Sequence, residues 1–277
     1  MKKQWLAIPY GLWALIFSIV PIVLIAIYSF CSRSPYGNII YEFTWDNYKQ
    51  FMEPIYLNVL WRSVMLALQS TAVCFILGYP MAMLIARSHV KKRSLMILLF
   101  ILPLWTNFLL RTYAWMVLLR DQGVINHVLM TLGLIEEPLK MLYTNGAVVL
   151  GMVYNFLPFM VLPIYSVLSK IDDSLIEAAE DLGAPFPRIF LKIIFPLSLP
   201  GVISGLIMVF MPAVSTFIIS DLLGGGQTIL LGNLIQNQFL VARNWQFGSA
   251  ISIIMITMIL LCMAIMSKYN EEGEGLW

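Results

Sequence analysis

The cysteines and histidines are the residues that could ligate a metal ion or act as nucleophile and base, and their spacing supports neither. Cys31, Cys74 and Cys262 are an odd number at intervals that match no metal motif. His89 and His127 are far apart and fall in predicted loops on opposite sides of a membrane. No G-x-x-x-x-G-K-S/T phosphate loop is present. We therefore expect no catalytic residue, no metal site and no cofactor bound by this chain.

Polar residues inside apolar runs could instead contact a transported molecule. Arg111 is the one clearly intramembrane charge, and Asp221 lies at the outer end of a predicted span. Charges at such depth are costly and are often functional. We expect Arg111 and Asp221 to pair or to line the external half of a translocation path. The alternative for Arg111 is a structural role in which its side chain reaches the membrane surface.

A group of aromatic and amide side chains near Arg111 has a related chemistry. Trp105, Asn107 and Tyr113 lie close together in the sequence, and aromatic faces with amide oxygens suit an ammonium ion. Helix packing and an interfacial aromatic belt are the alternative explanation. Asn155 lies in another apolar run, where its amide could hydrogen-bond to a neighbouring helix. These residues are candidates for the translocation path.

A polar stretch from Ser174 to Pro200 separates two apolar runs. Ser174 and Glu177 have the spacing of a capping box, which predicts that a helix starts there. Gly183 and Pro185 are expected to end that helix. A second short helix is expected from Pro187 to Phe195, with breaks at Pro196 and Pro200. Ala178 and Ala179 would leave a bare surface for another protein, although a connector lying on the membrane surface has similar features.

The composition requires a membrane around these elements. The chain of 277 residues is 60% hydrophobic and 12% charged, whereas soluble domains carry about 25% charged residues. The net charge of +2 gives no indication of nucleic-acid binding. We expect an all-α integral membrane protein with one transmembrane domain over residues 1–277, in which each span holds enough apolar residues for a hydrocarbon core that needs about 20. The six expected spans are residues 6–30 (uncleaved and kinked at Pro21), 63–86, 95–119, 147–168, 199–220 and 249–266.

The distribution of cations predicts the orientation of these spans. Four cations in the short loop of residues 87–94 favour a cytoplasmic position. With both termini inside, the cytoplasmic segments carry ten Lys and Arg residues and the external ones six. The loop of residues 169–198 is then cytoplasmic. We find no internal repeat, which disfavours a secondary transporter built from inverted repeats.

The order Glu177, Ala178, Ala179, then Gly183, Ile193 and Pro196 resembles the EAA signature of ABC importer permeases. The resemblance implies a type I importer fold in which this loop is a coupling helix that docks into a cytoplasmic ATPase. Phe195 stands where the family usually has Leu, an apolar-for-apolar change. The resemblance extends over nearly the whole chain to the polyamine-type branch. It is carried by LPLWTNFLLRTYAW (102–115), NFLPFMVLPIYSVLSKID (155–172), SDLLGGGQTILLGNLIQNQF (220–239) and NWQFGSA (244–250).

That resemblance implies a multi-pass protein of the bacterial inner membrane that imports spermidine or putrescine. Its expected partners are a second similar permease, an ATPase dimer that binds ATP and Mg, and an external or periplasmic polyamine-binding protein. The binding protein largely sets selectivity in such systems, so this sequence does not rank the two polyamines. The alternatives are a permease for another small ligand and a self-contained secondary transporter. A membrane-embedded enzyme would need clustered His, Asp or Glu at membrane depth, which the spans lack.

Overall fold

The computed structural model describes residues 8–33 and 39–274, which are almost entirely helical. Within these residues five helices are long and apolar enough to cross a membrane. A bent pair, residues 90–105 and 108–131, raises the number to six if the pair counts as one span. The five are Gly11–Ser29, Pro54–Ala86, Asn145–Leu168, Phe186–Ser215 and Trp245–Met266. The expected all-α multi-pass protein is confirmed.

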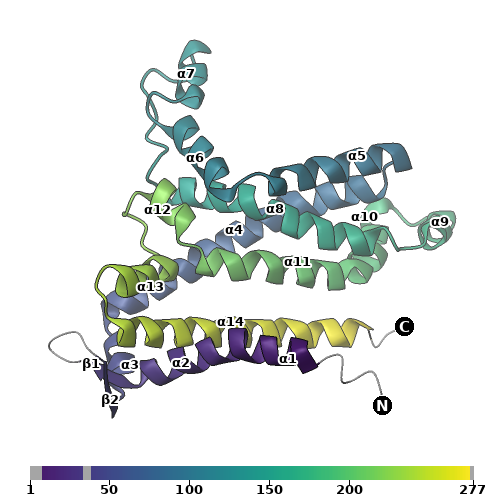
Figure 1. Ribbon diagram of the computed structural model, residues 1–277. Helices are drawn as coiled ribbons and strands as arrows, with labels where there is room; N and C mark the ends of the chain where they lie inside the picture. Colours follow the sequence, from purple (N-terminus) through teal and green to yellow (C-terminus); the bar gives the residue numbers. More distant parts are fainter. Residues whose placement is uncertain (1–7, 34–38, 275–277) are drawn as a thin grey trace. The chain divides into compact units, whose positions relative to one another are not determined.

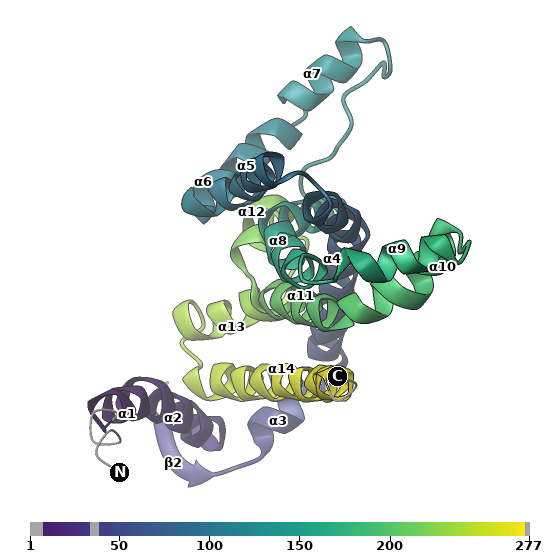
Figure 2. The ribbon, with the colours of Figure 1, turned by 90° about the vertical axis from the view of Figure 1, so that its right-hand side faces the viewer.

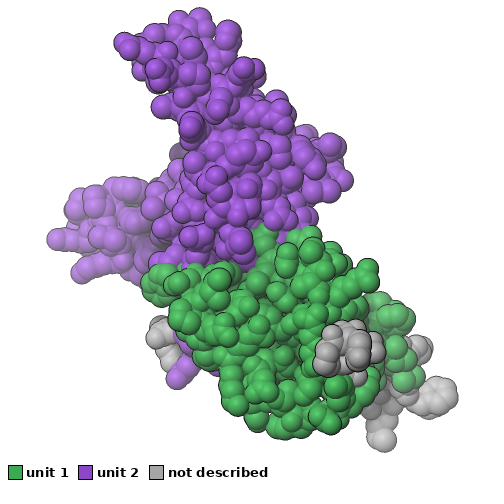
Figure 3. Space-filling view, turned by 90° about the vertical axis from the view of Figure 1, so that its left-hand side faces the viewer, with its two compact units in different colours: residues 1–61, 231–260 green, residues 62–230, 261–277 purple. Residues whose placement is uncertain are grey.

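The chain forms two compact units, shown in different colours in Figure 3. Unit 1 contains residues 1–61 and 231–260, and unit 2 contains residues 62–230 and 261–277. Two boundaries fall inside long helices, α4 (Pro54–Ala86) and α14 (Trp245–Glu274), and the third lies at the start of α13 (Leu231–Leu240). The single permease domain expected over the whole chain stays a prediction.

Unit 1 begins with the first span and ends in α14. The span consists of α1 (Ile8–Ala14), the π-helical segment η2 (Leu15–Ile19) and α2 (Val20–Ser29). The antiparallel strands β1 (Cys31–Arg33) and β2 (Ile39–Phe43) follow, then α3 (Asp46–Phe51). The last elements are α13 (Leu231–Leu240) and α14. A core of Phe51, Leu231, Phe247 and Ile251 joins these parts of the sequence.

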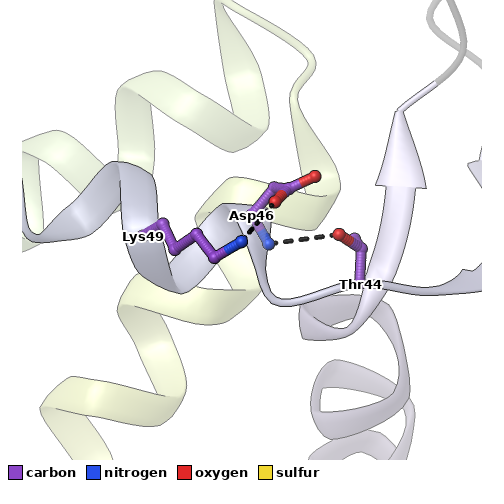
Figure 4. A network of polar contacts seen from close by, with 3 residues as sticks. All are labelled: Thr44, Asp46 and Lys49. Carbon is purple, nitrogen blue, oxygen red and sulfur yellow. Dashed lines mark hydrogen bonds and ion pairs between the residues drawn. The ribbon is translucent and has the colours of Figure 1, made fainter.

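The described residues after the first span form two strands and a short helix. The amide of Asn47 donates to the carbonyls of Ser29 and Cys31, each at 3.0 Å, and so holds α3 against the end of α2. Figure 4 shows that Thr44, Asp46 and Lys49 gather at the start of α3. The Asp46 amide donates to the Thr44 hydroxyl at 3.2 Å, and Lys49 pairs with the Asp46 carboxylate at 3.3 Å. Hydrogen bonding with Thr44, followed by that with Lys49, lowers the pKa of Asp46.

Unit 2 holds the remaining spans and the polar stretch between them. Figure 1 shows α8 and α11 side by side, with α9 and α10 at one end of this pair and α12 at the other. The pair packs closely because glycines replace larger side chains. A Cβ on Gly201 would lie 2.9 Å from the carbonyl oxygen of Pro163, and one on Gly205 would lie 2.9 Å from the Met160 sulfur. The elements after α4 are α5 (Val90–Ile101), the 3-10 segment η3 (Leu102–Trp105), α6 (Phe108–Leu119), α7 (Val124–Thr131), α8 (Asn145–Leu168), α9 (Asp173–Asp181), α10 (Phe186–Ile189), the π-helical segment η4 (Phe190–Ile194), α11 (Phe195–Ser215) and α12 (Ile218–Gly224).

The third predicted span is not one helix. Its two halves meet at an angle of 93° after η3. Thr106 is extended, and the Asn107 side chain accepts a hydrogen bond of 2.8 Å from the Leu109 amide, which starts a new helix. The fifth predicted span also divides, because α11 ends at Ser215 and α12 begins at Ile218. The second span starts earlier than expected, at Pro54 rather than at residue 63.

Candidate functional site

The predicted capping box at Ser174 and Glu177 is wrong, because α9 starts earlier. Asp172 is the N-cap, and its carboxylate accepts a hydrogen bond of 3.0 Å from the Ser174 amide. A charged acceptor at this position makes a stronger bond than a neutral serine hydroxyl. The pKa of Asp172 is lowered first by the backbone amide and then by the side chain of Ser174. Ser174 itself lies in the first turn of the helix.

The predicted end of α9 at Gly183 is confirmed. Gly183 has φ of +74°, a left-handed conformation that disfavours other residues. Its amide donates to the Glu180 carbonyl at 2.8 Å, and the Ala184 amide donates to the Ala179 carbonyl at 3.0 Å. These two bonds define a Schellman motif, which satisfies carbonyls that the helix leaves free. A Cβ on Gly183 would meet no atom within 4 Å, so the requirement for glycine comes from the backbone.

The two alanines of the EAA signature face different surroundings. Ala179 is buried against the rest of the chain, whereas Glu177 and Ala178 are exposed. Leu182, immediately before Gly183, is 88% exposed. Phe186 and Leu191 continue the exposed apolar surface onto the next helical segment. We call residues 173–191 the coupling segment. Its apolar side chains at Leu182, Phe186 and Leu191 are exposed, as is Ala178, as predicted. The prediction that Ala179 shares this bare surface is wrong, because Ala179 is buried.

The second short helix does not end at Pro196 as predicted. Residues 186–215 run without a break through α10, η4 and α11, and Pro196 and Pro200 lie inside this run. Pro196 stands at the start of α11, which follows directly after η4, whereas Pro200 lies inside α11, where a proline removes one amide donor. The π-helical segment ends with the Phe195 amide bonded to the Phe190 carbonyl, directly before Pro196. Figure 2 shows the second part of the coupling segment continuing into α11.

The path candidates on the third span lie around its bend. Trp105 ends η3 and is strongly exposed, and the Asn107 oxygen is used as the cap of α6. Tyr113 is about half exposed on α6. The Arg111 guanidinium lies 6.0 Å from the centre of the Phe108 ring. Its Nε and Nη1 atoms are buried without a hydrogen-bond partner among the residues that the structure describes.

Arg111, Asn155 and Asp221 lie on three helices that pack against one another, α6, α8 and α12. Asn155 is 1% exposed, and its amide donates to the Gly151 carbonyl at 2.8 Å. Its Oδ1 atom has no partner within the described part of the chain. Asp221 is exposed in the first turn of α12. The structure therefore brings these helices together, while the pairing of Arg111 with Asp221 and the lining of a path stay predictions.

Two residues that the sequence did not single out contact the coupling segment and the start of α11. The hydroxyl groups of Tyr79 and Ser198 are 2.8 Å apart, and both residues are buried. The Arg87 guanidinium lies 5.5 Å from the centre of the Phe186 ring. A tyrosine in the middle of an otherwise apolar run was the one available signal, because a buried phenol requires a hydrogen-bond partner.

The fold matches that of a known transporter. A bacterial alginate ABC transporter, solved in complex with an alginate pentasaccharide-bound periplasmic protein, superimposes with a TM-score of 0.79 at 17% identity. The superposition covers 96% of this chain and 93% of the solved one. The likeness shows that this chain shares its fold with a chain of that transporter.

Sequence relatives identify the class of transport protein. Residues 74–272 match the family of binding-protein-dependent transport system inner membrane components. The spermidine/putrescine transport system permease protein PotB of Haemophilus influenzae is 39% identical over 94% of this chain and 91% of its own length. The PotB protein of Escherichia coli K12 is 43% identical over 87% of this chain and 88% of its own length. The chain belongs to this family of inner membrane transport components, in which ATP hydrolysis is the task of a partner ATPase.

Proposed function

We propose that this chain is half of the translocation path of an ATP-driven importer for polyamines, spermidine or putrescine. The observation that carries the proposal is the identity of 39% and 43% to two PotB proteins over most of the chain. A second, similar permease would provide the other half of the path. A periplasmic binding protein would deliver the polyamine, as the solved alginate importer has a periplasmic protein bound. This assembly places the coupling segment and both termini in the cytoplasm.

The coupling segment is proposed to dock on one copy of an ATPase dimer that binds ATP and Mg. Glu177 and Ala178 would face the ATPase, because both are exposed. The buried Ala179, together with Gly183, Ile193 and Pro196, would set the shape of the segment. The uninterrupted helix from residue 186 to residue 215 would pass the movement of the docked segment to the path. Closure of the ATPase dimer then changes which side of the membrane the permease pair opens to.

The proposed path runs past the packed helices α6, α8 and α12. The unpartnered Asn155 oxygen can accept a hydrogen bond from an ammonium group, and the Asp221 carboxylate attracts it. Trp105, Asn107 and Tyr113 would contact the polyamine nearer the bend. A free Arg111 guanidinium would repel a polycation. The site would therefore be open to the substrate while Arg111 pairs with Asp221, and closed when the pair separates. The unpartnered guanidinium atoms of Arg111 are in keeping with a partner that changes during transport.

Gentle purification from the native membrane tests this assembly. An affinity-tagged chain is extracted in several mild detergents, and the proteins that remain with it are identified by mass spectrometry. We expect an ATPase and a second permease in amounts comparable to the tagged chain. Recovery of the chain alone in every detergent, together with polyamine transport by the chain alone, would favour the self-contained transporter instead. An assembled importer that takes up another small ligand but no polyamine would contradict the proposed substrate and leave the proposed assembly unchanged.

A further inference from the structure

The C-terminal half of α4 contacts the coupling segment and the start of α11 at several points. The Tyr79 ring lies 5.6 Å from the Phe190 ring and 5.8 Å from the Phe195 ring, measured between centres. Arg87 follows directly after the last residue of α4, and its guanidinium lies over the Phe186 ring at 5.5 Å. The eight residues from Tyr79 to Arg87 correspond to about 12 Å of helix. This end of α4 therefore runs beside the helix that links the coupling segment to the membrane.

The loop after α4 is folded so that Arg87 is held in place. Arg93 donates from Nη2 to the Ala86 carbonyl at 2.6 Å, which satisfies a free carbonyl at the end of α4. Arg87 and Arg93 line a small cavity of about 60 Å³ together with Asp173, the first residue of α9. Ile176 of α9 also lines this cavity. The loop thus faces the start of the coupling segment, and Arg87 reaches its second half.

We propose that Arg87 is a positioning residue that holds the coupling segment against α4 through the face of Phe186. This inference rests on the proposed docking of the segment on an ATPase. A docked segment would then move α4 as well as α11, because Arg87 and Tyr79 join α4 to the helix that starts at Phe186. The contact suits a joint that has to slide slightly, since a guanidinium can shift over an aromatic face without breaking a directional bond.

The test compares replacements of the two partners in the fully assembled importer. The complexes are reconstituted in proteoliposomes with the periplasmic binding protein, and the polyamine imported is measured per ATP hydrolysed, with spermidine and putrescine as probes. Arg87→Gln removes the cation, and Phe186→Leu removes the ring while keeping an apolar side chain. We expect each to lower the ratio about two- to five-fold, the range that an exposed cation–π contact can supply. The double replacement should lower it no further than either single one, and Arg87→Lys should keep most of it.

Lys91→Gln is the matched control, because Lys91 is an exposed cation in the first turn of α5, four residues after Arg87, and its loss changes the net charge equally. An unchanged ratio in Arg87→Gln and Phe186→Leu would overturn the proposal, as would an equal loss in Lys91→Gln. Gly183→Val separates this inference from the function on which it rests. Normal uptake in Gly183→Val would contradict the proposed coupling role of the segment. Loss of uptake in Gly183→Val, together with a normal ratio of polyamine imported to ATP hydrolysed in Arg87→Gln, would contradict only the proposed role of Arg87.

Hydrogen exchange gives a second measurement that does not depend on transport. In the intact permease, the amides of α9 should exchange faster in Arg87→Gln and Phe186→Leu than in Lys91→Gln, because the segment is held less firmly. Equal exchange in all three variants would contradict the contact as a positioning device.

Discussion

Replacement of Gly183 by valine should uncouple the importer without removing it from the membrane. Gly183 has φ of +74°, and a side chain there would meet no atom within 4 Å. The cost is therefore that of the left-handed backbone, about 1–2 kcal/mol for a residue with a Cβ. A β-branched side chain is disfavoured further in this conformation. A penalty of this size changes an equilibrium by about 5–30-fold. The equilibrium constant for ending α9 as observed should fall by at least this factor.

The assay measures uptake of labelled spermidine or putrescine by cells that contain the whole importer, with the chain in the membrane quantified by immunoblot. Uptake should fall with the fraction of molecules in which α9 ends correctly, by up to about 5–30-fold in Gly183→Val for a penalty of about 1–2 kcal/mol. Gly183→Asn should retain much more, since asparagine tolerates the left-handed conformation. Normal uptake in Gly183→Val, or equal loss in the asparagine variant, would refute the reasoning.

Gly133 supplies a matched control from the same chain. It follows α7, has φ of +68° and also has open space around its Cα. Its amide donates to the Met130 carbonyl, and the next amide donates to the Leu129 carbonyl, each at 3.0 Å. This is the same Schellman motif with the same backbone requirement, outside the coupling segment. Gly133→Val should therefore leave uptake much closer to normal. Equal loss in the two valine variants would show that the backbone penalty, rather than coupling, causes the defect.

Three further predictions concern other contacts. Tyr79→Phe should lower the free energy of unfolding by about 0.5–1.5 kcal/mol, because it removes one bond to Ser198, and thermal unfolding in detergent would show no shift if the bond were unimportant. Hydrogen bonds lower the pKa of Asp172 in the folded protein. The stabilisation of α9 by Asp172 is therefore complete above the ordinary pKa of the carboxyl group and is lost as the pH falls through the lower folded value. Hydrogen exchange of the α9 amides, corrected for intrinsic rates, should show this loss in the wild type but not in Asp172→Ala. Exchanging the charges of Arg111 and Asp221 in one double variant should preserve uptake if the two only pair, whereas loss would indicate that each contacts substrate.

The spans with clear apolar runs and clear ends were predictable from the sequence. The fourth span was expected at residues 147–168 and is found as Asn145–Leu168. The end of α9 was also predictable, because glycine after a helical pattern has a specific backbone reason. These features depend on residues that are close together in the sequence.

Other features depended on which of several local signals prevails in the folded protein, and the sequence does not decide this. Both Asp172 and Ser174 are good N-caps, and the charged side chain provides the observed cap. The apolar run of residues 95–119 contains a helix breaker, Pro103, and a helix-capping residue, Asn107, but its composition does not give the angle of the bend. Prolines 196 and 200 looked like breaks, yet a π-helical segment before the first of them lets the helix continue. Such outcomes depend on packing between α8 and α11, which no local pattern records.

The contacts of the candidate sites were the least predictable part. The EAA spacing located the coupling segment, but it did not show that Ala178 is exposed while Ala179 is buried. Arg87 appeared in the sequence only as one of four cations that orient a loop. Its contact with Phe186 joins residues that are far apart in the chain and becomes visible only in three dimensions.

The central claim is that this chain transports polyamines only as part of an ATP-driven assembly. The most direct test is uptake into proteoliposomes that contain this chain, the second permease, the ATPase and the binding protein, with each component omitted in turn. We predict accumulation of spermidine or putrescine that requires ATP and all four components. Accumulation by this chain alone, without ATP, would contradict the claim.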